Sequence, residues 1–114
     1  MSDCLFCKII HGDIPSKKVY ENENVYAFKD IYPQASEHYL FISKNHTKDV
    51  NELVTSGNEL NHIFAAIKDF TENETELAKN GFRVVTNMGK HGCQTVFHTH
   101  FHVLGGEQLS SFGK

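Results

Sequence analysis

Hydrophobic and polar residues alternate along the chain in patterns that predict several short helices and strands. Near the N-terminus, "CLFCKIIHG" places Leu5, Phe6, Ile9 and Ile10 on one side of a helix that Gly12 can end. "KKVYENENVYAFKD" indicates two strands joined by an acidic, Asn-rich turn. "HYLFIS" indicates a strand that carries apolar side chains on both faces. We therefore expect a sheet that is covered on both sides.

The second half of the chain predicts a longer helix followed by two strands. Ser56 and Glu59 have the spacing of a helix-capping box. Apolar residues then recur at the spacing of a core-facing stripe: Leu60, Ile63, Phe64, Ile67 and Phe70. "GFRVVTN" predicts a strand, "NMGKHGC" a glycine-bearing loop and "TVFHTHFHVL" a final strand. Segregated helices and largely antiparallel strands indicate an α+β domain.

Composition limits what kind of protein this can be. A chain of 114 residues suits one domain with one core, and we expect a single domain over residues 1–114. Hydrophobic residues make up 39% of the chain, and no run approaches the roughly 18 apolar residues of a membrane span. The N-terminus lacks the pattern of a secretory leader, and a formal net charge of -3 argues against a nucleic-acid surface. We therefore expect a cytoplasmic protein with neither a membrane nor a nucleic acid as partner.

Three histidines occupy every second position of the last predicted strand. In a helix, the side chains of His98, His100 and His102 would point in different directions, whereas in a strand they share one face. The other face would carry residues that suit a core: Phe97, Thr99, Phe101 and Val103. A solvated face in a histidine-rich chain is the simpler alternative. Buried imidazoles need partners for both ring nitrogens, so the pattern favours a functional site.

Two kinds of chemistry fit such a face. Imidazoles on a strand can ligate a metal, or one imidazole can attack an electrophile while its neighbours fix its tautomer. A phosphoryl or nucleotidyl centre is a natural electrophile for histidine. The preceding loop, "NMGKHGCQT", could surround a phosphate with backbone N–H groups and with the side chains of Asn87, Gln94 and Thr95. The residues alone leave metal binding and covalent catalysis both open.

The spacing Cys4-x-x-Cys7 allows three interpretations. The pair could be a redox motif, although the predicted elements lack the βαβ context of such motifs. It could also be two free thiols beside a short helix, or a pair of metal ligands. With Cys93 the chain has three cysteines, an odd number that suits a metal site or free thiols better than a disulfide framework.

"QTVFHTHFHVL" resembles the signature of the histidine triad (HIT) family, in which three histidines alternate with apolar residues. "CLFCKIIHGDIPSKKVYENENVYAFKDIYPQASEHYLFISKNH" and "GFRVVTNMGKHGCQTVFHTHFHVLGG" resemble the two halves of its Hint branch, the histidine triad nucleotide-binding proteins. Thr99 departs from the apolar signature, and Cys93 stands where the family often has glycine. The resemblance implies a five-stranded antiparallel sheet with one long and one or two short helices. It also implies a homodimer formed through the long helix and the "GFRVVTN" strand.

The resemblance implies an activity as well, the hydrolysis of purine nucleoside phosphoramidates such as AMP linked through nitrogen to an amine. His100 would be the nucleophile, and water would release a nucleoside monophosphate from a nucleotidyl-histidine intermediate. His102 would orient His100 and contact the phosphate. His98 would support the triad with His38 as its partner. Thr95 replaces a serine that the family usually has near the scissile bond.

Nucleotide-binding residues follow from the same resemblance. Asp30 would hold the ribose hydroxyls, and Asn87 would lie near the ribose and phosphate. The apolar slot for the base is assigned to Phe6, Ile9, Phe28 and Ile31. From the residues alone, Asp30 could instead belong to a turn, His38 could be a structural histidine and Ile9 could be ordinary core.

A structural zinc is the one cofactor that the resemblance implies. Some relatives with the N-terminal cysteine pair hold such an ion, and the matching ligands here are Cys4, Cys7, His46 and His98. Two thiolates and two imidazoles form a closed tetrahedral site, which is typical of structural zinc. Two other functions stay open at this point: a nucleotide-binding interaction module with little turnover, and a zinc-dependent hydrolase that uses the triad as ligands.

Overall fold

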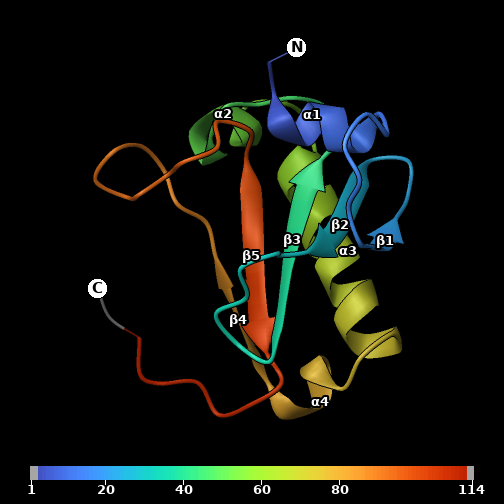
Figure 1. Cartoon of the computed structure of the whole chain (residues 1–114), viewed down its shortest axis with the longest axis vertical. Helices are drawn as coiled ribbons and strands as arrows, with labels where there is room; N and C mark the ends of the chain where they lie inside the picture. The colour runs from blue at the N-terminus through green and yellow to red at the C-terminus, as the bar shows by residue number, and fades with distance from the viewer. Residues whose placement is uncertain (1–2, 113–114) are drawn as a thin grey trace.

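The computed structural model describes residues 3–112, which form one five-stranded antiparallel sheet and four helices (Figure 1). The strands are β1 (Lys18–Glu21), β2 (Val25–Lys29), β3 (Glu37–Ser43), β4 (Phe82–Val85) and β5 (His100–Gly105), in the spatial order β1-β2-β3-β5-β4. The helices are α1 (Leu5–Ile10), α2 (Val50–Val54), α3 (Glu59–Asn73) and α4 (Leu77–Asn80). The predicted α+β class, antiparallel sheet and long helix are confirmed, with three short helices rather than one or two. Over this range, every helix is too short or too polar to cross a membrane.

The sheet is apolar on both faces, as the strand pattern predicts. The face toward α3 packs Val25, Ala27, Tyr39, Phe41, Phe101 and Val103 against Ile63, Ala66, Ile67 and Phe70. The opposite face packs Tyr26, Phe28, Leu40 and Ile42 against Phe6 and Ile9 of α1. In Figure 1, α3 runs behind the sheet, and α1 lies at the end of the sheet near the N-terminus. β5 pairs His102 with Leu40 and His100 with Ile42, so both histidines share the α1 face.

The last strand begins at His100, five residues after the start of the predicted strand at Thr95 and two after His98. The backbone N–H of Thr99 donates to the carbonyl of Thr47 over 2.7 Å, and the two threonine hydroxyls lie 2.7 Å apart. These bonds tie the chain before β5 to the loop after β3 instead of to a neighbouring strand. Consequently, His98 lies outside the strand, and Phe97, which we expected in the core, is 57% exposed. The prediction of three histidines on one strand face is wrong for His98.

The predicted capping box of α3 is wrong as well. The hydroxyl of Ser56 donates to the carbonyl of Glu52 over 3.0 Å, at the end of α2. The carboxylate of Glu59 accepts hydrogen bonds from Oγ of Ser43 at 3.1 Å and from Nδ2 of Asn45 at 2.6 Å. Because Ser56 bonds to α2 and Glu59 bonds to Ser43 at the end of β3, neither side chain caps α3. The sequence pattern could not reveal α2, which is only five residues long.

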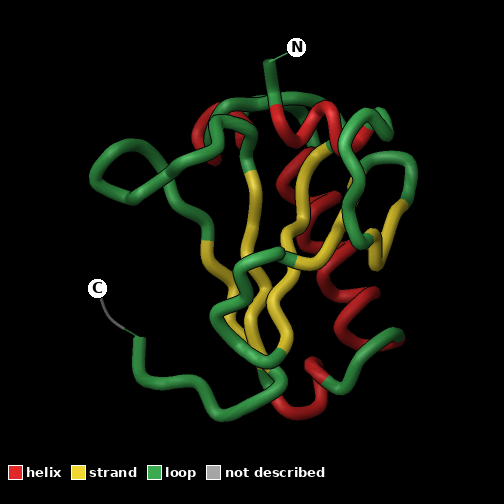
Figure 2. The backbone as a smooth tube through the Cα atoms, in the orientation of Figure 1, coloured by secondary structure: helices red, strands yellow, loops and turns green. Residues whose placement is uncertain are grey.

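Cys93 has a backbone conformation that is unusual for a residue with a side chain. It lies in the long loop between β4 and β5 (Figure 2), and its φ angle is +62°. Two backbone hydrogen bonds close a turn at this point in the loop. The N–H of Cys93 donates to the carbonyl of Lys90, and the N–H of Gln94 donates to the carbonyl of Gly89. The left-handed region crowds Cβ against the backbone at a cost of about 1–2 kcal/mol. Glycine has no Cβ and avoids this cost, which explains why a glycine would suit position 93.

We expect Cys93→Gly to raise the free energy of unfolding by up to about 1 kcal/mol. Removing Cβ relieves the left-handed crowding, and the greater freedom of glycine in the unfolded chain offsets part of that gain. Cys93→Val should lower the free energy of unfolding by about 1–2 kcal/mol, because a β-branched side chain fits this region poorly. Cys93→Ala, which keeps Cβ and removes the thiol, is the control. Urea denaturation would measure all three, and equal stability of the Gly and Val variants would contradict the backbone argument.

Candidate functional site

A cavity of about 380 Å³ opens on the α1 face of the sheet. Eight of the residues predicted to bind a nucleotide line it: Phe6, Ile9, Phe28, Asp30, Ile31, Thr95, His100 and His102. Its walls are apolar where α1 meets β2 and polar where β5 contributes its two histidines. The cavity therefore joins an apolar slot, suited to a flat ring, to a polar end suited to an anion.

His100 is buried at the polar end, and its partners determine which ring nitrogen is free. Its Nδ1 lies 2.8 Å from the carbonyl oxygen of His98. Since a carbonyl can only accept, Nδ1 carries the proton and Nε2 of the neutral ring carries a lone pair. The ring of Phe6 packs against it edge-on, with centroids 5.1 Å apart. Burial lowers the pKa of His100, which favours the neutral form. Such a ring can act as a nucleophile or as a metal ligand.

His102 belongs to a chain of hydrogen bonds that begins at a backbone amide. The N–H of Gln34 donates to Nδ1 of His38 over 3.1 Å, so the neutral His38 ring carries its proton on Nε2. That Nε2–H donates to Nδ1 of His102 over 2.9 Å, which leaves the proton of His102 on Nε2. Burial lowers the pKa of His102 to about 4 and also lowers the pKa of His38. The chain therefore presents His102 as a neutral hydrogen-bond donor beside His100.

His38 does not pair with the triad histidine that the prediction gave it. His38 pairs with His102 rather than with His98. Its Nε2 also lies 3.4 Å from Oδ2 of Asp30, which raises the pKa of His38 against the larger effect of burial. Asn87 lines a neighbouring cavity of about 370 Å³ that also contacts His38 and His102. Because His102 lines both cavities, Asn87 lies close to the polar end of the first one.

Gln94 holds the loop together, which corrects its predicted role at a phosphate. Its side-chain N–H groups donate to the carbonyls of Lys48 at 2.6 Å and Val96 at 3.1 Å. Its side-chain oxygen accepts from the N–H of Gly89 at 3.0 Å. A phosphate requires donors, and both donors of this buried amide are already used. Gln94 therefore shapes the loop that passes the cavity.

Cys4, Cys7, His46 and His98 meet in a cluster at the N-terminal end of α1. One potential ligand atom from each lies within 4.8 Å of the other three. Sγ of Cys4 is 3.2 Å from Nδ1 of His98, and Sγ of Cys7 is 3.5 Å from Nδ1 of both histidines. Burial, followed by the neighbouring Cys4, raises the pKa of Cys7 to about 11, so a thiolate here needs a cation to stabilise it. Two sulfurs and two imidazoles are the donor set of tetrahedral zinc.

The ring of His98 belongs to the cysteine–histidine cluster, whereas the backbone carbonyl of His98 bonds to His100 in the cavity. Its Nε2–H donates to the carbonyl of Ser43 over 2.8 Å, which leaves the lone pair on Nδ1 facing the sulfurs. A metal-ligating histidine typically donates its other N–H to such a carbonyl. The backbone carbonyl of His98, not its ring, accepts from His100. Metal ligation and support of His100 therefore do not compete for one nitrogen.

Asp30, His38 and His102 also bring three potential ligand atoms together. Their separations of 2.9, 3.4 and 4.0 Å would permit a shared ion. The backbone N–H of Gln34 argues against a metal ion bound by these three residues. An ion on Nε2 of His38 would move the ring proton to Nδ1, where it would face the N–H that now donates to Nδ1. These three residues therefore suit a hydrogen-bonded chain, whereas the cysteine–histidine cluster suits a metal.

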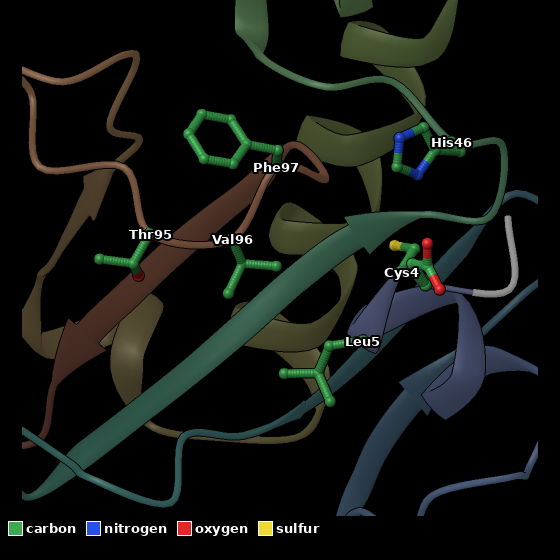
Figure 3. Close-up of a pocket in the computed structure, with 7 residues that line it drawn as sticks. Cys4, Leu5, His46, Thr95, Val96 and Phe97 are labelled. Carbon is green, nitrogen blue, oxygen red and sulfur yellow. The ribbon is translucent and has the colours of Figure 1, made fainter.

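A larger groove, of about 740 Å³, adjoins this cavity, and Figure 3 shows residues that line the groove. Leu5, Thr95 and Val96 line both spaces, so they form the boundary between them. Phe97 lies on the groove side of this boundary, and His46 of the cysteine–histidine cluster also lines the groove.

Sequence reasoning missed the groups that fix the tautomers of the histidines. These are the N–H of Gln34 and the carbonyls of Ser43 and His98. Backbone atoms carry no signal of residue type, so only the fold could reveal them. The apolar Tyr32, which follows the predicted Ile31 and lines the same cavity, was within reach of the sequence pattern.

Comparison with known proteins identifies relatives of this chain. The family model described as "Scavenger mRNA decapping enzyme C-term binding" matches residues 3–114. A 14 kDa zinc-binding protein of Zea mays is 41% identical over 114 residues, which cover 96% of this chain and 86% of that protein.

Solved structures share the fold as well. A HIT family hydrolase from Legionella pneumophila Philadelphia 1 is 40% identical with a TM-score of 0.88, covering 95% of this chain and 96% of the other. A histidine triad nucleotide-binding protein from Candida albicans is 32% identical with a TM-score of 0.81, covering 98% of this chain and 87% of the other. Sequence identity of this extent, on the same fold, shows that the chain belongs to the histidine triad (HIT) family.

Proposed function

We propose that this protein is a purine nucleoside phosphoramidate hydrolase of the Hint branch, which releases a nucleoside monophosphate through a nucleotidyl-histidine intermediate. One observation carries the proposal. The bond from Nδ1 of His100 to the carbonyl of His98 leaves an unprotonated Nε2 at the polar end of a cavity with an apolar slot. The hydrolase and the nucleotide-binding protein among the similar structures support the same reaction class.

In the first step, Nε2 of His100 attacks the α-phosphorus, and the bond from phosphorus to the amine nitrogen breaks. The nitrogen keeps the electron pair and takes a proton from water at the exposed rim, directly or relayed through the hydroxyl of Thr95, which gains a proton as it gives one. The bond from Nδ1 to the carbonyl of His98 stabilises the positive charge that develops on the ring. Nε2–H of His102 donates to a phosphate oxygen as negative charge builds up there.

In the second step, water attacks the same phosphorus. The bond from phosphorus to Nε2 breaks, and its electron pair returns to His100. The proton lost by the attacking water passes to solvent and balances the proton taken up by the amine in the first step. The nucleoside monophosphate leaves, and the neutral His100 is ready for another cycle.

The purine would lie in the apolar slot of Phe6, Ile9 and Phe28, with the ribose beside Asp30. Oδ1 of Asp30 accepts from the N–H of Tyr32 over 2.8 Å, a turn bond that fixes the carboxylate at the rim. The turn role and the ribose role of Asp30 are therefore compatible, because a carboxylate can accept several hydrogen bonds.

The cysteine–histidine cluster would hold a structural zinc. Such an ion supplies cross-linking rather than chemistry, because all four positions are taken by protein ligands. It would join α1 to the loop after β3 and to the entry of β5. Since Phe6 and Ile9 of α1 line the cavity, the same ion would hold the wall of the base slot.

A homodimer would form through α3 and β4. The two edge strands of the sheet differ in how they are protected. β1 carries an irregularity between Lys18 and Tyr20 and an ion pair of 2.9 Å from Lys18 to Glu21, features that discourage edge pairing. Beside β4, by contrast, Phe82 is 36% exposed and Phe64 of α3 is 42% exposed. Both line one shallow depression, which a second copy could cover.

Two rival functions predict different behaviour. A zinc-dependent hydrolase would lose activity as soon as its metal is removed, whereas loss of a structural zinc would first lower stability. The amide of Gln34 opposes metal ligation by the His38–His102 pair, which makes this rival less well supported. A nucleotide-binding module with little turnover would bind AMP without hydrolysing a phosphoramidate.

We expect His100→Ala to lower kcat for AMP release from adenosine 5′-phosphoramidate by about 1,000-fold or more, because the covalent route is lost. Wild-type protein quenched during turnover in alkaline denaturant should carry one nucleotidyl group by intact mass, and the variant should carry none. His11→Ala, an exposed histidine outside the cavity lining, should match the wild type. Turnover that survives in His100→Ala would exclude His100 as the nucleophile, and AMP binding without any wild-type turnover would favour the binding module.

Metal analysis of the purified protein should find one zinc ion per chain. Cys7→Ser should lose most of that zinc and lower Tm by about 10 °C, because a ligand of a structural site is removed. AMP affinity should fall as well, since α1 also carries part of the base slot. Cys93→Ser is the matched control, because this exposed thiol lies outside the cluster. Full zinc content in Cys7→Ser would contradict the ligand assignment.

Light scattering on a sizing column should give the mass of a dimer for the wild type and of a monomer for Phe64→Glu. A carboxylate in the depression between α3 and β4 would have to be desolvated in the dimer. Phe82→Glu tests the same surface independently, because Phe64 also packs on Phe101 with ring centroids 5.4 Å apart. Val54→Glu, on the exposed side of α2, is the control. A dimer that persists in both phenylalanine variants would place the interface elsewhere.

A further inference from the structure

The groove beside the cavity takes no part in the steps above, although it is the larger of the two spaces. Its volume is about 740 Å³, compared with about 380 Å³ for the cavity. Large apolar side chains on its walls face solvent, with Leu5 43% and Phe97 57% exposed. Single exposed apolar residues are common on protein surfaces. Here, however, they line one concave surface that meets the candidate active site.

Thr95 relates this groove to the reaction. Its side chain lines both spaces, and the proposed mechanism puts its hydroxyl at the leaving nitrogen. In an in-line displacement at phosphorus, the leaving atom departs on the side opposite the nucleophile. The described lining of the groove includes Thr95 but neither His100 nor His102. A substituent on the leaving nitrogen would start beside Thr95, and the groove is the larger of the two spaces that Thr95 borders.

The backbone that carries Phe97 is anchored on its C-terminal side. The residue after it, His98, is fixed by the carbonyl of Ser43 and by the cysteine–histidine cluster. Thr99 is tied to Thr47 through backbone and side chain. An anchored backbone has less conformational freedom to lose when a ligand binds.

We propose that this groove is the subsite for the leaving amine and that it selects amines with an apolar substituent, with Phe97 as the specificity-determining residue. The proposal rests on the function proposed above. Leu5 and Val96 would contact the substituent on the side shared with the cavity, and Phe97 would stack on it or pack edge-on against it. Asp3 also lines the groove, so the apolar contacts would act beside one carboxylate.

The test compares two substrates with one variant. The substrates are adenosine 5′-phosphoramidate and its N-(2-phenylethyl) derivative, and the variant is Phe97→Ala. We expect the variant to lower kcat/KM for the phenylethyl substrate about tenfold and to leave kcat/KM for the unsubstituted one within about twofold of wild type. Because each variant is compared with wild type on the same substrate, differences in leaving-group basicity cancel. Phe97→Leu should recover part of the loss, because it restores apolar contact.

Val54→Ala is the control, an exposed apolar residue on α2 that lies outside the groove lining. Zinc content and circular dichroism would confirm that Phe97→Ala keeps the fold. An equal loss on both substrates, or no loss on either, would overturn the subsite while wild-type turnover leaves the proposed hydrolase intact. If the wild type hydrolyses neither substrate, the proposed function fails, and the subsite fails with it.

Discussion

The site depends on how His98 is held where the chain enters β5. Its ring donates to the carbonyl of Ser43 on one side and faces two sulfurs on the other, while its own carbonyl accepts from His100. One residue thereby fixes the tautomer of the candidate nucleophile and closes the cysteine–histidine cluster. Its neighbour Thr99 secures the same stretch to the loop after β3. The geometry of the cavity therefore follows from a short segment that belongs to no strand.

The histidines around the cavity act as neutral groups. Burial lowers the pKa of each of His38, His98, His100 and His102, and the values for His98 and His102 are about 4. At neutral pH these rings therefore bring no positive charge to a bound phosphate. Instead they offer hydrogen-bond donors and acceptors in fixed positions, because backbone groups bonded to the rings determine which ring nitrogen carries the proton. A preorganised arrangement of dipoles can stabilise charge in a site that water enters poorly.

Much of the fold could be predicted from the sequence, because its core elements follow simple periodicities. Tyr39 and Phe41 do face α3, while Leu40 and Ile42 face α1, as strand alternation requires. Of the cavity residues, His100, His102 and Thr95 were found through the histidine pattern and the loop before it, whereas Asp30 and the apolar slot were found through the family resemblance. Several of the failures share one cause, which is a hydrogen bond between segments distant in sequence. Thr99 meets Thr47, Glu59 meets Ser43, and Gln94 meets Lys48, and no local pattern announces these partners.

Helix α1 is only six residues long, yet two sets of residues alternate within and just before it. Cys4 and Cys7 belong to the cysteine–histidine cluster, and Phe6 and Ile9 belong to the cavity. Each set has a spacing of three residues, and the two sets are offset from each other by two positions. A helix turns by about 100° per residue. One residue inserted between Cys4 and Phe6 would rotate everything after it, carrying both Cys7 and the slot residues off their targets. The length of this segment is thus constrained twice, once by the cluster and once by the cavity.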